Sequence, residues 1–167
     1  MRHLLRILGV TAVVLVVASA SASAATATQN VTATATVAAR ATLTLSAATL
    51  TFADANPDTT PSIAATEGAI TVTAKGRTST GGSITLTTVS ADDFKSGTDV
   101  ILASALTWTA SGAGYAAGTM NKATAQSVGS WTGPGNNAGQ LTFALANSWS
   151  YATGSYTMAV TYTLTAP

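Results

Sequence analysis

The stretch Gly154–Pro167 reads GSYTMAVTYTLTAP, and its pattern decides the fold class. From Tyr156 to Leu164, large apolar residues alternate with small and mostly polar residues. Alternation with a period of two is typical of a β-strand that packs one face on a core and exposes the other face to water. Aromatic and β-branched residues suit such a half-buried surface. We therefore predict a regular strand here, with a central place in its sheet.

The longest alternation in the chain runs from Val31 to Leu45, where every odd-numbered residue is apolar. At about 3.3 Å per residue, a strand of this length would span roughly 50 Å, well beyond the usual length of a strand. Two structures are consistent with the pattern. We favour one strand that crosses from one sheet to another near Ala38–Arg40. The alternative is an N-terminal arm, residues 25–37, that precedes a shorter strand.

Shorter alternations separated by turn residues follow in the rest of the chain. We expect strands in the ranges 50–52, 70–74, 84–87, 106–108 and 141–145. The segment Gly68–Ser90 predicts a β-hairpin, and the glycine-rich stretch Ala110–Gly139 predicts a long connection with one or two short strands. Turns about every ten residues and the lack of a helical period predict an all-β fold, an antiparallel β-sandwich of Ig-like or jelly-roll type with about seven to nine short strands. A closed barrel is the alternative.

The first 24 residues have the three parts of a secretory signal peptide. A basic start with Arg2, His3 and Arg6 is followed by an apolar run at 8–17 and by small residues, with cleavage expected after Ala24. The apolar run is too short to cross a hydrocarbon core of about 30 Å comfortably. We expect a secreted protein with no transmembrane segment after cleavage, folded as a single domain over residues 25–167.

The composition of residues 25–167 argues against catalysis. This part of the chain has five basic and six acidic residues, no cysteine and no histidine, because the only histidine is His3. A net charge near −1 gives no basic field for nucleic acid. The lack of His and Cys removes the commonest metal ligands and nucleophiles. Asp54, Asn56 and Asp58 resemble the start of a calcium loop, but Thr59 stands where Gly is required, which favours a capped turn. We expect no enzyme activity, no cofactor and no metal site.

Aromatic residues are the candidate ligand contacts. Trp131 lies in a glycine-rich stretch and is expected to be exposed, so that it could form a sugar-stacking platform with Tyr115. Trp108 and Trp149 are expected to fill the core instead.

A C-terminal motif and an upstream stretch carry a family resemblance. The motif consists of Tyr156, Val160, Thr161, Tyr162, Thr163, Leu164 and Pro167, and the upstream stretch is 84–94 followed by 103–108. Together they resemble the WxL-type domain of Gram-positive surface proteins over residues 68–167. The chain departs from the family at Ile84, where the family has Trp two residues before Leu, and at Tyr162, where the motif has Trp. The resemblance implies a secreted β-sandwich held non-covalently at the cell wall or in a surface complex.

A second resemblance concerns the N-terminal arm. Its apolar residues Val31, Ala33, Ala35 and Val37 share one parity. A Thr- and Ala-rich, all-β secreted chain with such an arm and a C-terminal strand is similar to chaperone–usher-type pilins and spore-coat-like subunits. That resemblance implies an arm that adds to the sheet of a neighbouring subunit through main-chain hydrogen bonds.

These observations predict a secreted, non-catalytic cell-surface protein with a structural or attachment role. Its expected partners are the cell wall or other surface proteins, with a homo-oligomer as a further possibility. One alternative is a pilin-like subunit that self-assembles by strand exchange of its N-terminal arm. The other alternative is a carbohydrate-binding module that uses Trp131 and Tyr115.

Overall fold

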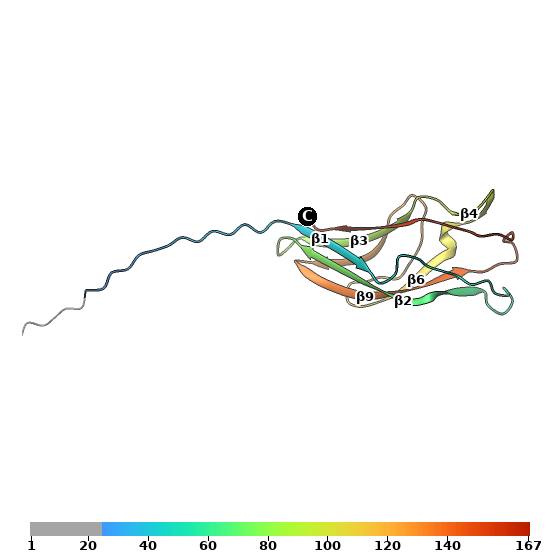
Figure 1. The fold of residues 1–167 in the computed structure, drawn as a ribbon, viewed down its shortest axis with the longest axis horizontal. Helices are drawn as coiled ribbons and strands as arrows, with labels where there is room; N and C mark the ends of the chain where they lie inside the picture. The colour runs from blue at the N-terminus through green and yellow to red at the C-terminus, as the bar shows by residue number, and fades with distance from the viewer. Residues whose placement is uncertain (1–24) are drawn as a thin grey trace, which may run out of the picture. The chain divides into compact units, whose positions relative to one another are not determined.

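The computed structural model describes residues 25–167 (Figure 1). The predicted signal peptide, residues 1–24, lies outside the described residues. The chain divides into one unit that ends at Ala35 and a second unit, Thr36–Pro167. Within the described residues, 25–39 carry no strand and have exposed side chains, and all of the secondary structure lies in the second unit.

The second unit is built from ten strands and one turn of 3₁₀ helix. They are β1 (Arg40–Leu45), β2 (Ser62–Arg77), β3 (Ser83–Ser90), β4 (Phe94–Ser96), β5 (Asp99–Ile101), η1 (Ala103–Ala105), β6 (Leu106–Ser111), β7 (Gly118–Thr119), β8 (Gln126–Thr132), β9 (Gly135–Ala146) and β10 (Val160–Thr165). Every pair of strands is antiparallel, so the predicted all-β, sandwich-like fold is confirmed. The strands are more uneven than expected, because β2 and β9 have 16 and 12 residues whereas β7 has 2.

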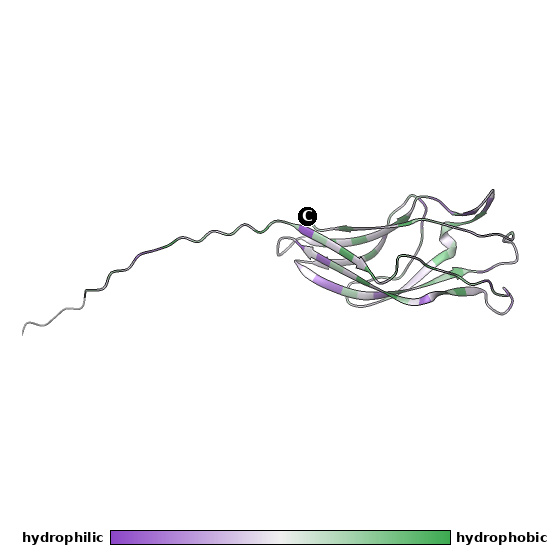
Figure 2. Cartoon of the chain, viewed as in Figure 1, coloured by the Kyte–Doolittle hydropathy of each residue, from purple (hydrophilic) through white to green (hydrophobic). Residues whose placement is uncertain are grey.

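The strands form two main sheets that share one core. The first has the order β1-β2-β9-β6-β7 and the second has the order β10-β3-β8, while β4 and β5 form a separate hairpin. The core contains apolar side chains of both main sheets, among them Val72, Leu86, Val128, Leu141 and Phe143. Figure 2 shows how hydrophobic and hydrophilic residues alternate along the long strands, which is why each sheet has one apolar face.

The two sheets are joined along one side. The Ala116 N–H donates to the Val128 carbonyl and the Ser130 N–H donates to the Gly114 carbonyl, both at 2.9 Å. The segment 114–116, just before β7, therefore pairs with β8 of the other sheet. Gly114 is required here, because its φ of +81° and the nearby Trp131 ring leave no room for a side chain. The sheets thus curl into a half-barrel that is closed along this seam, which is made of residues 114–116 and 128–130.

The favoured crossing strand at Val31–Leu45 was wrong. β1 begins only at Arg40, which lies opposite Arg77, the last residue of β2. Among the described residues, 25–39 have no ladder partner, so alternation alone does not make them a strand. The alternative prediction, an N-terminal arm before a shorter strand, agrees with the structure.

The predicted hairpin at Gly68–Ser90 was also wrong. β2 pairs with β1 and β9, whereas β3 belongs to the other sheet. The connection 78–82 carries the chain across the core, and Ile84 packs on Gly76, where a Cβ atom would lie only 2.4 Å from the Ile84 Cδ1 atom. The faces of the two strands therefore meet across the core and their edges do not meet.

Three smaller predictions need correction as well. No strand forms at 50–52, where Thr51 is tied to β2 through the Thr66 N–H and the Glu67 carboxylate. The stretch 110–139 is more regular than expected, because it contains the seven-residue β8 and the start of β9. The final strand β10 lies at the edge of its sheet, although its alternation predicted a central place. Alternation reports which face of a strand is buried, and it does not report how many neighbours the strand has.

Candidate functional site

No ladder of hydrogen bonds joins the two end strands of the half-barrel, β1 and β10, although some of their Cα atoms lie within 8 Å of each other. β1 pairs only with β2, and β10 pairs only with β3. Each strand therefore presents one row of backbone N–H and C=O groups without a ladder partner in the described residues. Because every step around the half-barrel from β1 to β10 is antiparallel, these two edges run in opposite directions.

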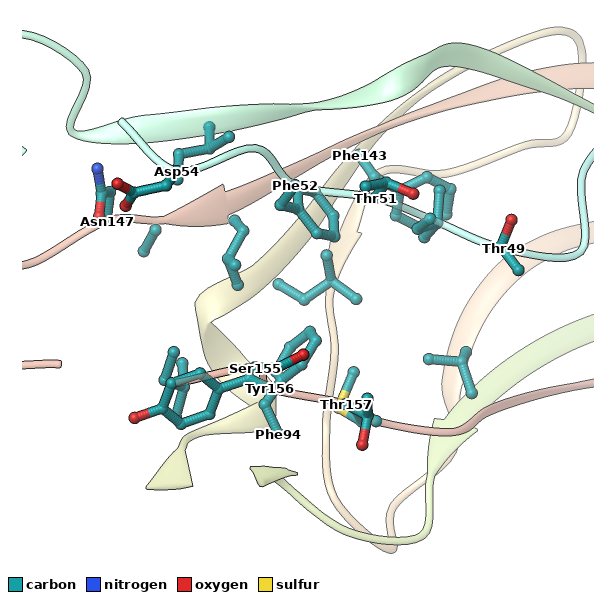
Figure 3. A pocket seen from close by; sticks show the side chains of 18 of the residues that line it. Thr49, Thr51, Phe52, Asp54, Phe94, Phe143, Asn147, Ser155, Tyr156 and Thr157 are labelled. Atoms are coloured by element: carbon teal, nitrogen blue, oxygen red, sulfur yellow. The ribbon is translucent and has the colours of Figure 1, made fainter. Parts of the chain in front are cut away.

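A groove of about 1560 Å³ lies along this opening (Figure 3). One wall is formed by β1 and the segment after it, up to Pro57, and the other wall by the segment 148–159 and β10. Figure 3 shows Thr49–Asp54 on one side and Ser155–Thr157 on the other, with Phe52 and Phe94 between them. Pockets for small ligands usually have about 300–1,000 Å³. The size and the two long walls therefore suit a segment of polypeptide better than a small molecule.

The apolar side chains of the two edge strands are only half-buried, whereas the groove also reaches fully buried residues of the core. Leu43 and Leu45 of β1 and Tyr162 and Leu164 of β10 all contact the core but keep part of their surface exposed. Leu164 lies opposite Leu86 of β3 in the ladder, and Leu86 is completely buried. The two leucines differ because Leu164 lies on the edge strand β10, which has no strand paired on its other side. Burial still raises the pKa of Tyr162 to about 12, so its phenol stays protonated at neutral pH.

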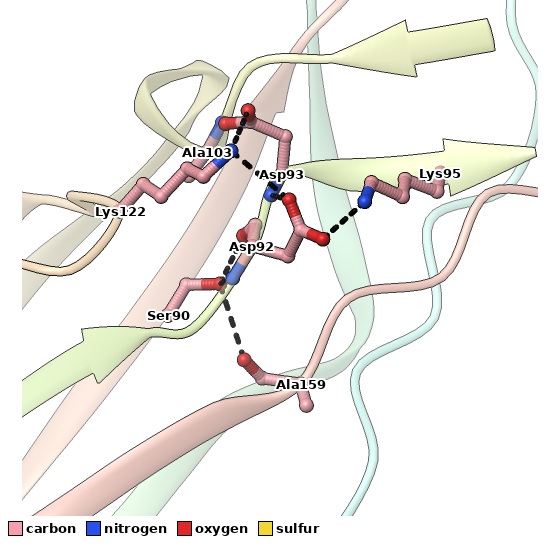
Figure 4. Close-up of polar contacts among 7 residues, drawn as sticks. All are labelled: Ser90, Asp92, Asp93, Lys95, Ala103, Lys122 and Ala159. Carbon is pink, nitrogen blue, oxygen red and sulfur yellow. Dashed lines mark hydrogen bonds and ion pairs between the residues drawn. The ribbon is translucent and has the colours of Figure 1, made fainter. Parts of the chain in front are cut away.

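A polar cluster holds the chain at the end of β3, near the start of β10 (Figure 4). Asp92 forms ion pairs with Lys95 and Lys122, and Asp93 accepts a hydrogen bond of 2.8 Å from the Ala103 N–H. The Lys95 side chain, followed by Lys122, holds the pKa of Asp92 far below its ordinary value. The Ser90 hydroxyl donates to the Ala159 carbonyl at 3.2 Å and so ties the cluster to the wall of the groove. The charges and hydrogen-bonding groups of the cluster are paired with one another, so the role of the cluster is to hold these loops in place.

Trp149 is the most exposed aromatic side chain of the described residues, at 70%. The prediction that it fills the core was wrong, whereas Trp108 is buried as predicted. The indole N–H of Trp149 donates to the Asp58 carboxylate at 2.9 Å. The Asn147 side-chain amide donates to the Ala55 and Thr60 carbonyls, which fixes the loop that carries Asp58. Trp149 is therefore held in place at one end of the groove, with its ring in water.

The predicted ligand contacts Trp131 and Tyr115 lie together on the seam. Their rings are 4.9 Å apart in an edge-to-face arrangement, and both are only partly exposed. The Trp131 N–H donates to the Ala113 carbonyl, and the Tyr115 hydroxyl lies 2.9 Å from the carbonyl oxygens of Val72 and Asn137. Their polar groups are thus used inside the protein, where they support the closed side of the half-barrel.

Four residues of the C-terminal motif, Tyr156, Val160, Thr161 and Tyr162, line the groove. Val160, Thr161, Tyr162, Thr163 and Leu164 lie in β10, where the two threonines are exposed and the other three pack against the core. Tyr156 packs against the core before β10, with its hydroxyl donating to the Ala152 carbonyl. The Pro167 carbonyl accepts a hydrogen bond from Thr78.

Sequence reasoning missed most of the groove. Leu50, Phe52 and Met158 contribute apolar surface to it from segments without regular structure. All three were expected on strands, at 50–52 and 156–164, because they follow the alternating pattern. Alternation does not show that they line a groove. The arm residues Val31, Ala33, Ala35 and Val37 are all exposed, with Val31 at 92% and Val37 at 70%.

Comparisons with known proteins add no relative. No protein family matches the chain, and neither a curated protein nor a solved structure shows significant similarity to it. In residues 25–167, no helix has the length and apolar character needed to cross a membrane. The same residues contain no group of three or more His, Cys, Asp or Glu side chains placed to hold a metal ion.

Proposed function

We propose that the protein is a secreted, non-catalytic structural subunit that assembles with copies of itself by strand exchange. The N-terminal arm, residues 25–37, of one copy lies in the groove between β1 and β10 of another copy. The observation that carries this proposal is the single long apolar opening in an otherwise continuous half-barrel, as far as residues 25–167 describe it. An added strand can pair with a free edge and cover the half-buried side chains beside it. To pair with both edges it must first separate β1 from β10 where they lie within 8 Å, because neighbouring strands lie about 4.8 Å apart.

The arm has the chemistry that such a strand needs. Its apolar residues share one parity and can all face the core, while the threonines between them face water. Val31 and Val37 are largely exposed. Burying each valine contributes about 1.5–3 kcal/mol, in addition to the gain from covering the leucines and aromatic residues of the walls.

The chain next to the arm favours exchange between copies. For the arm to pair beside its own β1, the chain would have to reverse at Ala38-Ala39, directly before Arg40. Two-residue hairpin turns require positive φ angles and are made mostly by Gly, Asn and Asp. Two alanines disfavour that turn, because their Cβ atoms clash in this conformation.

Export and a surface location follow from the predicted signal peptide and belong to the same proposal. Attachment to the cell wall, which the C-terminal motif predicts, is supported by the motif alone. Three motif residues of β10, Val160, Thr161 and Tyr162, line the groove, so addition of a strand is the function that the geometry supports best.

Substitutions of opposite parity in the arm test the proposal in the chain that begins at Ala25. Ala33→Asp with Ala35→Asp places two charges on the face that enters the groove, so it should abolish oligomers in light scattering. The matched variant Thr32→Asp with Thr34→Asp places the same two charges on the water-facing side and should assemble like the parent. Equal assembly of both variants would rule out insertion of the arm with this parity.

A further inference from the structure

The charged side chains of the described residues are sorted by sign along the molecule. The 16 residues of β2 span about 50 Å between the two ends of the unit. Near the Arg77 end of β2 lie three cations and, among the described residues, no acidic side chain. We call this the cationic end: Arg40, Lys75 and Arg77. All six acidic residues, with the remaining two lysines, lie in the other half: Asp54, Asp58, Glu67, Asp92, Asp93 and Asp99, with Lys95 and Lys122.

The cationic end carries uncompensated charge. Arg40 and Arg77 lie directly opposite each other across β1 and β2, and like charges in that position repel. Neither arginine forms an ion pair with another described residue, and the same is true of Lys75. In contrast, Lys95 and Lys122 both pair with Asp92. The side chains are exposed, so water screens this repulsion, and an anionic surface would turn it into attraction.

The opposite end offers such a surface. Asp54 and Asp58 are both exposed, lie in the loop that reaches the groove at Asp54 and Pro57, and form no ion pair with a described cation. Trp149 stands beside them, fixed by its hydrogen bond to Asp58. A preorganised, exposed indole is the kind of residue that anchors a protein interface, because little rotamer freedom remains to be lost on binding. We call this surface the acidic end: Asp54, Asp58 and Trp149.

We propose that these two surfaces form a junction, in which the cationic end of one copy docks on the acidic end of the next. The inference rests on the proposed strand exchange. The arm joins the folded unit at Arg40, and thus at the cationic end. The groove reaches Pro57 and Trp149 at the acidic end. An arm that enters the next groove at that end lies antiparallel to β10 and parallel to β1, and it brings opposite charges together.

Entry from the other end has a different result. It would bring two cationic ends together, with three positive side chains on each side of the contact. It would also leave Trp149 in water at both ends of a closed, two-fold dimer. Opposite charges favour the head-to-tail arrangement, and a head-to-tail contact of this kind continues into an open chain of subunits.

Charge removal at the acidic end tests the junction. In the chain that begins at Ala25, Asp54→Asn with Asp58→Asn removes both charges, while the amide introduced at position 58 keeps an oxygen that can accept the Trp149 hydrogen bond. We expect the rate of assembly in low salt to fall roughly three- to tenfold, because complementary charge mainly accelerates association. The difference should vanish near 1 M salt, where screening acts over about 3 Å. The control Glu67→Gln removes one acid from the middle of β2, keeps an oxygen that can accept the hydrogen bond from the Thr51 N–H, and should leave the rate unchanged.

The emission of Trp149 provides a second measurement. The difference spectrum between the parent and Trp149→Phe should shift to the blue on assembly, as the indole leaves water. Closed dimers in which Trp149 stays exposed would overturn the head-to-tail junction and leave strand exchange intact, and so would a parental rate for the double variant. Chains that stay monomeric at all concentrations would overturn the proposed function itself.

Discussion

At the scale of single residues, Leu86 and Leu164 form a natural comparison, because they are cross-strand partners of the same type. Leu86 is completely buried, and its replacement by Ala should cost about 2–5 kcal/mol of the free energy of unfolding. Leu164 is half-buried beside the groove. In a chain without residues 25–37, Leu164→Ala should cost about half as much as Leu86→Ala or less, since less apolar area is lost.

Urea denaturation of the two variants without the arm measures these costs. The cost of Leu164→Ala should rise in the assembled protein, where a second copy covers the side chain. Equal costs for the two leucines in the isolated subunit would mean that the groove is already filled from within the chain.

The residue scale also shows what could be predicted from the sequence. Parity identified Ile84, Leu86 and Leu141 as core residues, and all three are completely buried. Parity did not separate Trp108 from Trp149, because each is a large aromatic residue in or near an expected strand. Their exposure depends on where the folded chain places them. Trp108 lies inside β6 against Phe143, whereas Trp149 lies in the connection between β9 and β10.

At the scale of elements, the proposed strand exchange requires that the seam is closed and that no ladder joins β1 to β10. Gly114→Ala tests the closed seam, because its Cβ atom would lie 2.3 Å from the Trp131 Nε1 atom at a φ of +81°. We expect a loss of at least about 1–3 kcal/mol in the free energy of unfolding. The matched variant Gly81→Ala has free space and an ordinary φ, and should change stability by about 0.5 kcal/mol or less.

Chemical denaturation of both glycine variants provides the comparison. A Gly114→Ala protein as stable as Gly81→Ala would show that the seam does not hold the two sheets together. The half-barrel would then have a second opening, and an added strand could bind there as well as in the groove.

Element types were easier to predict from the sequence than the pairing of elements. Alternation identified the strands at Ile70–Ala74 and Leu141–Leu145 correctly, and these two strands pair with each other. The same signal placed β2 beside β3 in a hairpin and β10 in the middle of a sheet. A local pattern does not show which residues far apart in the chain pair in a ladder. The position of the groove depends on those ladders, so it could not be predicted.

At the scale of the whole molecule, the proposed strand exchange accounts for two features together. One is a half-barrel whose end strands form no ladder, and the other is an N-terminal arm with the alternating pattern of a strand. The chain has no cysteine to lock the open side. A strand from another copy would complete the core, and the charges at the two ends would set the direction of assembly. The arm and groove together therefore give this small, weakly charged chain a route to an extended structure.

The most direct test is the molar mass in light scattering of the chain that begins at Ala25, with and without residues 25–37. Strand exchange predicts that the protein with the complete arm has a molar mass above that of one chain, and that this mass grows with concentration. Deletion should return a monomer that still unfolds cooperatively. If both proteins are monomers and the deletion greatly lowers the free energy of unfolding, the arm packs on its own subunit. That result would contradict strand exchange.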